Sequence, residues 1–383
     1  MKIGFFTNTY FPICYGSVVS IESFRKNLEK LGHDVYVFAP GHNGYKDECD
    51  KIFRYPAFLF RYKIDYPISI PMSSFINKKI EELDLDIIHV HQPFSLGKEG
   101  LKFARKLNIP VVFTYHAKYE DYVHYVPLFP ENLLSELVKK EAVNFANKCD
   151  LTITPSHGIK KIIQTRGVRK GLIKVLPTGI DWQSFQKNGR ANLRKKYGIK
   201  SDEILCINIG RINEEKNLNL LFNSVKEIIS QNPKVKMMFV GEGFLREELI
   251  KKSKKAGLKN NFIFPGFIKY EEVKKYWQAA DIYLQTSISE TQGMTILETM
   301  AAGLPVVAVK GTGTEDFIKS GENGILTKNN QRDFVEKVKF VIKNPKEAKK
   351  ISLQAKKDSK EYEESKQTKK LEKIYEKLIK EKN

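Results

Sequence analysis

The sequence has few cysteines and no long apolar run. Its four cysteines, Cys14, Cys49, Cys149 and Cys206, are widely spaced and form no Cys-x-x-Cys pair. This spacing argues against both a zinc site and a disulfide framework. No apolar run approaches the roughly 18 residues that a membrane-spanning helix needs, and the first residues lack the apolar core of a secretory signal. We therefore expect a protein of the reducing cytoplasm that does not span a membrane.

The length of the chain limits the number of domains, and its charge limits the classes of binding partner. A chain of 383 residues exceeds what one hydrophobic core usually organises, so two domains with a cleft between them are expected. The 65 lysines and arginines against 45 acidic residues give a formal net charge of +20. Such a charge attracts polyanions, which include nucleic acid, an anionic membrane surface and a phosphorylated substrate. Charge alone does not choose among them.

The apolar pattern predicts the fold class. Short β-branched or aromatic runs alternate with helical patterns, which is typical of parallel sheets covered by helices on both faces. The alternation lapses in the polar stretch 182–203 and then starts again. We predict an α/β protein of two Rossmann-like doubly wound domains, 1–185 and 186–354. The Lys/Glu-rich C-terminal segment has apolar residues at helical spacing, which predicts an amphipathic helix.

Two glutamates lie around the start of a predicted helix that follows a strand. Ligands of open α/β sheets bind at the carboxyl ends of strands, and the helix amides of Gly293, Met294 and Thr295 suit a diphosphate there. Glu290 and Glu298, when ionised, only accept hydrogen bonds, so they need donors such as the hydroxyls of a sugar and a ribose. The alternative is that both glutamates only stabilise the helix start.

A second charged group follows the first strand of the second predicted domain. Gly210, Arg211 and Lys216 lie in the segment 208–217. Arginine binds phosphate oxygens bidentately and lysine neutralises another, an arrangement that stabilises charge on a departing diphosphate. Each alone would be interpreted as a solvated surface charge, but their shared position after a strand and a glycine favours a function.

The first domain contributes weaker signals. Gly16 and Ser17 lie between the first strand and its helix, where a donor phosphate could approach the backbone, although turn chemistry alone would also explain them. His116 follows a strand and could contact the transferred sugar or stabilise its transition state. His89 and His91 alternate on another strand, and we expect one to be packed and the other to line the acceptor site.

Asp84 and Asp86 imitate the metal-binding Asp-x-Asp motif of other transferases. They precede a buried strand, where aspartate is common turn chemistry, so we predict no metal site.

Two stretches of the first domain, 58–71 and 122–140, mix aromatic and basic residues. Strands and core helices explain much of this composition. The densest group is nevertheless typical of an anionic bilayer interface; it consists of Phe58, Phe60, Arg61, Tyr62 and Lys63.

Taken together, these residues resemble the retaining glycosyltransferases of family 4, which have the GT-B fold of two Rossmann-like domains facing a central cleft. The likeness covers almost the whole chain and is carried by the glycine-arginine-x4-lysine of 210–216, the Glu-x7-Glu of 290–298 and the segment 304–318. Within the family, the segments 10–21, 114–125 and 290–298 are similar to diacylglycerol glucosyltransferases, which make membrane glucolipids.

The resemblance implies roles for the charged residues of the second domain. Glu290 is expected to contact hydroxyls of the donor sugar, Glu298 the nucleotide ribose, and Arg211 with Lys216 the diphosphate. Family members retain the anomeric configuration by front-face attack, in which the leaving diphosphate helps to deprotonate the acceptor, and they need neither a metal nor a cofactor.

The resemblance also implies roles in the first domain. Gly16 is expected near the phosphate and His116 near the sugar, and a C-terminal helix of about 355–383 is expected to pack on this domain. The glycine pair often found in the first loop is Gly16-Ser17 here, so the phosphate contacts of that loop stay open.

We therefore predict a cytoplasmic enzyme, peripheral at the inner face of the cell membrane, that moves glucose from UDP-glucose onto diacylglycerol with retention. One alternative is a phosphatidylinositol mannosyltransferase that uses GDP-mannose, and another is a family 4 transferase with a soluble acceptor. A glycoside hydrolase also uses two carboxylates, but these must flank one bond. A nucleic-acid-binding protein would explain the charge, yet no recognised binding motif accompanies it, so we expect no nucleic acid partner.

Overall fold

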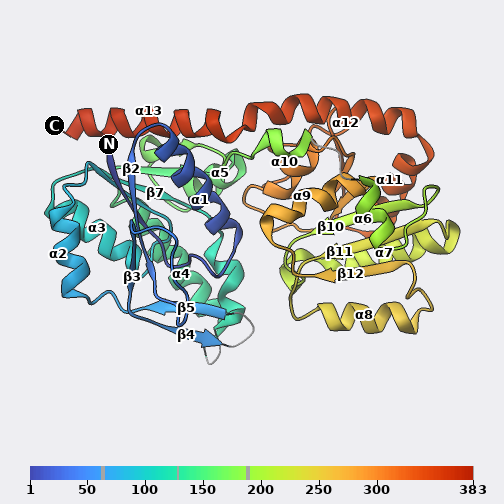
Figure 1. The fold of residues 1–383 in the computed structure, drawn as a ribbon, viewed down its shortest axis with the longest axis horizontal. Helices are drawn as coiled ribbons and strands as arrows, with labels where there is room; N and C mark the ends of the chain where they lie inside the picture. Colours follow the sequence, from blue (N-terminus) through green and yellow to red (C-terminus); the bar gives the residue numbers. More distant parts are fainter. Residues whose placement is uncertain (62–64, 127–128, 187–189, 383) are drawn as a thin grey trace. The chain divides into compact units, whose positions relative to one another are not determined.

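The computed structural model describes residues 1–61, 65–126, 129–186 and 190–382 (Figure 1). The chain divides into two compact units, a first unit of Met1–Gly179 with Glu364–Asn383 and a second unit of Ile180–Glu363. Among the described residues, no helix combines the length and the apolar composition that crossing a membrane requires.

The unit boundaries differ by a few residues from those predicted at 185/186 and 354/355. Ile180 and Phe185 belong to a hydrophobic core of the second unit, and the Trp182 indole donates to Ser359 Oγ at 3.0 Å. The chain segments on both sides of the predicted boundaries are therefore held in the second unit by packing, which a break in periodicity does not reveal.

The first unit is built on a seven-stranded parallel sheet with the order β3-β2-β1-β6-β7-β8-β9. Because the order reverses between β1 and β6, the switch point, where ligands bind in such sheets, lies between these two strands. The strands are β1 (Lys2–Phe6), β2 (Asp34–Pro40), β3 (Ile52–Tyr55), β6 (Ile87–Val90), β7 (Val111–Thr114), β8 (Leu151–Thr154) and β9 (Ile173–Val175).

Both faces of this sheet are buried, which explains its continuous apolar runs. Phe5 and Phe6 of β1 point to opposite faces, as successive strand residues do, and enter two different cores. The flanking helices are α1 (Gly16–Lys30), α2 (Ser74–Glu82), α3 (Leu96–Lys106), α4 (Glu131–Ala146) and α5 (His157–Thr165), with the 3-10 helices η1 (Tyr119–Tyr125) and η2 (Lys170–Leu172). A separate antiparallel hairpin, β4 (Ala57–Arg61) and β5 (Asp65–Ser69), was not predicted.

The C-terminal segment folds as more than one helix. The predicted helix 355–383 is interrupted by the 3-10 turn η5 (Lys360–Tyr362), so that α12 (Pro345–Ser359) belongs to the second unit and only α13 (Glu364–Lys382) to the first. Leu371 and Tyr375 of α13 are fully buried in the core that also holds Ile21 of α1. The predicted packing on the first unit is thus confirmed for α13, and the predicted start was nine residues too early.

The second unit has a six-stranded parallel sheet with the order β12-β11-β10-β13-β14-β15, so its switch point lies between β10 and β13. The strands are β10 (Ile204–Ile209), β11 (Val235–Val240), β12 (Phe262–Gly266), β13 (Ile282–Gln285), β14 (Val306–Val309) and β15 (Ile325–Thr327). Its remaining elements are α6 (Arg190–Lys196), α7 (Leu218–Gln231), α8 (Arg246–Lys255), α9 (Tyr270–Ala279), α10 (Met294–Ala301) and α11 (Gln331–Lys343), with the 3-10 turns η3 (Trp182–Gln186) and η4 (Glu214–Lys216).

Candidate functional site

The predicted charged residues of the second unit meet at its switch point. Gly210 and Arg211 follow β10, Lys216 ends η4, and Glu290 lies in the loop after the neighbouring strand β13. The Lys216 ammonium nitrogen lies 2.5 Å from Glu290 Oε1. Two motifs that are 74 residues apart in the sequence therefore form one ion pair at the edge of the sheet where ligands bind.

Hydroxyl side chains that the sequence reasoning missed fix the loop geometry. Thr286 Oγ1 donates to the carbonyls of Lys216 and Asn217 at 3.0 and 2.9 Å, and Ser289 Oγ donates to the carbonyl of Glu215 at 3.1 Å. These bonds tie the loop after β13 to η4. The only signal in the sequence is a run of small hydroxyl residues directly after a strand, which polar loops commonly contain.

Arg211 is oriented by an ion pair of its own. Its Nη2 lies 2.9 Å from Glu215 Oε1, and the Glu215 side chain is only 5% exposed. Arg211 also lowers the pKa of Glu290 through its charge, so the guanidinium belongs to the same electrostatic group as the Lys216–Glu290 pair.

Glu290 is ionised at neutral pH. Burial acts to raise its pKa, but the charge of Lys216 and the hydrogen bond from Lys216 outweigh burial, so the pKa of Glu290 lies below its ordinary value. An ionised carboxylate accepts hydrogen bonds, as the prediction for the donor sugar requires.

Glu298 behaves differently from Glu290. It lies on α10, is 3% exposed, and accepts a hydrogen bond from the Tyr270 hydroxyl at 2.9 Å. Burial raises the pKa of Glu298 to about 7, so its carboxyl group is partly protonated at neutral pH. The sequence reasoning treated both glutamates as ionised, because burial is invisible in a motif.

The start of α10 lies after the carboxyl end of β13, at the edge of the sheet where ligands bind in open α/β folds. Gly293 is the N-cap residue with φ of 73°, a left-handed conformation that favours glycine, and Met294 is the first helical residue. Amides of a first helical turn precede the intrahelical hydrogen bonds and are available to an anion. The Thr295 hydroxyl is held by the Tyr283 hydroxyl at 3.0 Å, so Thr295 offers its amide rather than its side chain.

Steric contacts explain why two positions of the segment 304–318 are glycines. A Cβ atom on Gly313 would lie 2.6 Å from the Glu290 carbonyl oxygen, and one on Gly311 would lie 3.1 Å from the Ile288 Cα. The loop after β14 therefore packs backbone to backbone against the Glu290 loop, which only residues without a side chain permit. Similarly, a Cβ on Gly241, after β11, would lie 1.9 Å from the Gly210 carbonyl oxygen.

Three histidines of the first unit, His89, His91 and His116, lie at or near the carboxyl ends of β6 and β7. His91 Nδ1 lies 2.9 Å from His116 Nε2, while His89 contacts the Tyr375 hydroxyl at 2.5 Å and the Thr114 hydroxyl at 2.6 Å. Both His89 and His91 are 1% exposed. The expectation that one of them would line the acceptor site is wrong, because both rings are buried: His89 contacts Tyr375 of α13, and His91 stacks on both His89 and His116.

All three histidine rings are neutral at neutral pH. Burial lowers the pKa of His89 and of His116 to about 3, and it lowers the pKa of His91 as well. His116 is thus a hydrogen-bonding group in this structure and not a cation.

Gly16 is the first residue of α1 and is exposed. Among the described residues, no heavy atom lies within 4 Å of the position that its Cβ would occupy. The packing of the fold therefore does not require glycine there, and its predicted contact with a phosphate stays a prediction.

The Asp84–Asp86 pair has the turn geometry expected from the sequence. Asp84 adopts φ of 52°, and Asp86 Oδ2 accepts a hydrogen bond from the Lys2 amide at 2.6 Å. Within the part of the chain that the structure describes, no three or more His, Cys, Asp or Glu side chains converge as metal ligands would.

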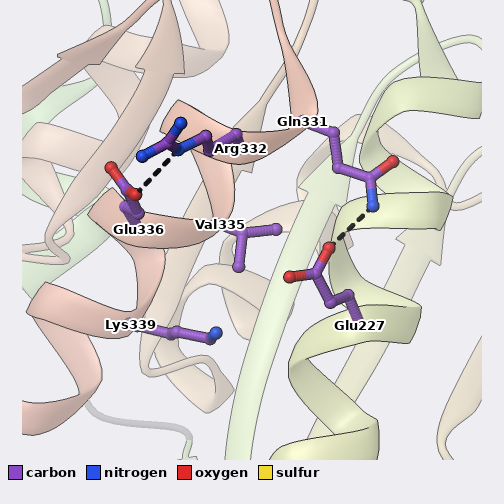
Figure 2. Close-up of a pocket in the computed structure, with 6 residues that line it drawn as sticks. All are labelled: Glu227, Gln331, Arg332, Val335, Glu336 and Lys339. Carbon is purple, nitrogen blue, oxygen red and sulfur yellow. Dashed lines mark hydrogen bonds and ion pairs between the residues drawn. The ribbon is translucent and has the colours of Figure 1, made fainter.

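A surface hollow of about 370 Å³ lies between α7 and α11 (Figure 2). Two acidic and two basic side chains line it; Gln331 donates to Glu227 at 2.7 Å, and Arg332 pairs with Glu336 at 3.3 Å. None of the predicted site residues lines it; the lining residues are Glu227, Gln331, Arg332, Val335, Glu336 and Lys339.

Two doubly wound units in one chain, with Arg211, Lys216 and Glu290 at the switch point of the second, have the architecture of the GT-B fold class. A solved structure of this architecture, the Anabaena protein Alr3699/HepE in complex with UDP, superposes with a TM-score of 0.78 at 19% identity, covering 98% of this chain and 99% of that one.

The chain belongs to glycosyltransferase family 4. The model "Glycosyltransferase Family 4" matches residues 15–183, and "Glycosyl transferases group 1" matches residues 189–358. An alpha-monoglucosyldiacylglycerol synthase of Acholeplasma laidlawii is 32% identical over 99% of this chain and 98% of its own length. The enzyme of the same name from Streptococcus pneumoniae is 34% identical over 80% of this chain and 71% of its own length. The chain is thus a glycosyltransferase, and the roles of its individual residues stay predictions.

Proposed function

We propose that this glycosyltransferase moves glucose from UDP-glucose onto the free hydroxyl of diacylglycerol and retains the anomeric configuration. The observation that carries the proposal is the convergence of Lys216, Arg211 and Glu290 at the switch point of the second unit. The names of the two relatives, both alpha-monoglucosyldiacylglycerol synthases, support glucose and diacylglycerol.

The basic side chains of the site bind the diphosphate, and the acidic side chains bind hydroxyl groups of the donor. Arg211 and Lys216 bind the diphosphate and stabilise the charge that develops as it leaves, with the amides of Gly293, Met294 and Thr295 as further donors. Glu290 accepts hydrogen bonds from hydroxyls of the sugar, and its ion pair with Lys216 at 2.5 Å links sugar binding to diphosphate binding. Glu298 in its ionised form accepts hydrogen bonds from the ribose.

The bond changes balance without a metal ion or a cofactor. The bond between the sugar C1 and the diphosphate oxygen breaks, and the acceptor oxygen bonds to C1 on the same face. The hydroxyl proton of the acceptor passes to an oxygen of the departing UDP, so no side chain has to remove it. His116 contacts the sugar as a neutral ring, and Gly16 lets the backbone approach the phosphate.

We further propose that the first unit rests on an anionic membrane surface at the inner face of the cell membrane. Exposed apolar side chains support this, because Phe129, Leu133 and Leu137, exposed by 63, 58 and 55%, recur every four residues in and just before α4. Phe58 on the β4–β5 hairpin is 54% exposed, and Arg61 is exposed as well; Tyr62 and Lys63 lie outside the described residues. The formal net charge of +20 also favours binding to anionic lipid. Each lysine or arginine close to the membrane surface adds about 1 kcal/mol to the binding free energy.

The test is turnover by the purified protein with vesicles of diacylglycerol and anionic lipid, in the presence of EDTA. UDP-glucose and GDP-mannose are compared, nucleotide release is measured and the lipid product is identified. We expect UDP release with a new α-glucolipid. A mannolipid formed from GDP-mannose would replace the donor assignment, and nucleotide binding without any lipid product would direct the search to a soluble acceptor.

A further inference from the structure

The rings of His89, His91 and His116 form a stack in the first unit. The ring centroids of His89 and His91 are 4.3 Å apart, and those of His91 and His116 are 5.2 Å apart. Phe5 packs edge-on against both His89 and His91. His116 is the residue predicted to contact the sugar. His91 is 1% exposed, so it contacts His116 from the buried side of the stack.

The hydrogen bond between His91 Nδ1 and His116 Nε2, 2.9 Å long, contains one proton, because burial keeps both rings neutral. Either His91 donates from Nδ1, or His116 donates from Nε2. In the second arrangement His91 carries its own proton on Nε2, a buried atom for which the described residues offer no partner. Buried N–H groups without an acceptor are rare, which favours donation from His91.

We infer that His91 is a positioning residue that holds His116 as the Nδ1–H tautomer, so that His116 offers the substrate a hydrogen-bond donor. The inference rests on the proposed function, which places His116 near the donor sugar. A donor suits a sugar hydroxyl oxygen or a departing phosphate oxygen, since both accept hydrogen bonds. A ring that offered a lone pair would act as a general base instead. His116 therefore stabilises charge, and deprotonation of the acceptor is left to the diphosphate.

Kinetics of two His91 variants test the inference. His91→Asn keeps an N–H donor near the position of Nδ1, whereas His91→Leu removes it. We expect His91→Leu to lower kcat about 10- to 100-fold, by analogy with the loss seen when a metal-ligating histidine loses the group that orients it, with little change in the KM for UDP-glucose. His91→Asn should recover most of this loss. Equal kcat values for the two variants would overturn the inference, because a packing role alone does not distinguish them.

Tyr375→Phe is the matched control. It removes the hydroxyl that contacts His89 Nδ1 in the same buried stack and leaves the His91–His116 bond in place. We expect its kcat to equal that of the wild type. A loss as large as that of His91→Leu would show that the whole stack, and not the His91 donor, determines the rate.

The tautomer itself is measured by NMR on protein labelled with ¹⁵N in the histidine rings, with the His116 signals assigned from a His116→Gln variant. We expect a protonated Nδ1 and an unprotonated Nε2 on His116, and the reverse in wild-type protein would overturn the inference. This measurement needs no turnover. Failure of the proposed function, seen as no glucolipid from the wild type, is therefore distinguishable from failure of the inference.

Discussion

The ion pair between Lys216 and Glu290 gives the sharpest prediction. Replacing Lys216 with methionine leaves the Glu290 carboxylate without its main partner while its side chain stays only 17% exposed. A hydrogen bond to a charged group contributes about 1.5–3 kcal/mol, so Lys216→Met should lower the free energy of unfolding by about 2 kcal/mol. For a unit of this size that corresponds to a Tm lower by about 4–8 °C.

The pH dependence of this loss has a definite sign. Because Lys216 and Arg211 depress the pKa of Glu290, the stabilisation is present above the unfolded-state pKa of about 4.3 and is lost as the pH falls through the folded-state pKa. The difference between wild type and Lys216→Met should therefore be larger at pH 7 than at pH 3. Urea unfolding followed by circular dichroism at both pH values measures it.

A matched surface pair provides the control. Lys234 and Asp202 form an ion pair at 2.9 Å with side chains 63 and 56% exposed, so Lys234→Met should lower the free energy of unfolding much less than Lys216→Met does. Equal Tm values for Lys216→Met and Lys234→Met would refute the burial argument. Loss of Lys216 should also lower kcat/KM by about 10²–10³-fold, as expected for a group that stabilises transition-state charge, whereas Lys234→Met should not.

Three further predictions concern the same protein. Because the pKa of Glu298 is raised to about 7, the protein should lose on the order of 3 kcal/mol of stability as pH rises from about 4.5 to 7, and Glu298→Gln should remove this slope in urea unfolding. Because only the ionised form of Glu298 is proposed to accept hydrogen bonds from the ribose, UDP should bind the wild type more tightly above pH 7 than below it, as measured by calorimetry. Gly313→Ala should lower kcat at least tenfold, because its Cβ would displace the Glu290 backbone; a fully active variant would contradict this. The double variant Leu133→Ser/Leu137→Ser should weaken sedimentation with anionic vesicles while UDP binding is unchanged; undiminished sedimentation would exclude α4 from the membrane contact.

Much of the fold could be predicted from periodicity. The alternation of short apolar runs with helical patterns predicts two doubly wound units, and each unit has a parallel sheet with flanking helices. The β4–β5 hairpin was missed because its aromatic and basic residues alternate irregularly and it joins neither main sheet. The break between α12 and α13 was missed because a Lys/Glu-rich helical pattern runs across it.

The sequence by itself determined the two-unit α/β architecture, the residue types of the candidate site and their position after strands, since apolar periodicity and loop chemistry are local properties of the chain. Only the tertiary structure decided which side chains meet. It paired Lys216 with Glu290, placed Gly313 against the Glu290 backbone, and buried His91 behind His116. It also separated the two glutamates, leaving Glu290 ionised and Glu298 with a pKa of about 7. The reason is that burial and charge partners come from residues distant in the sequence, and these fix the ionisation of a carboxyl group.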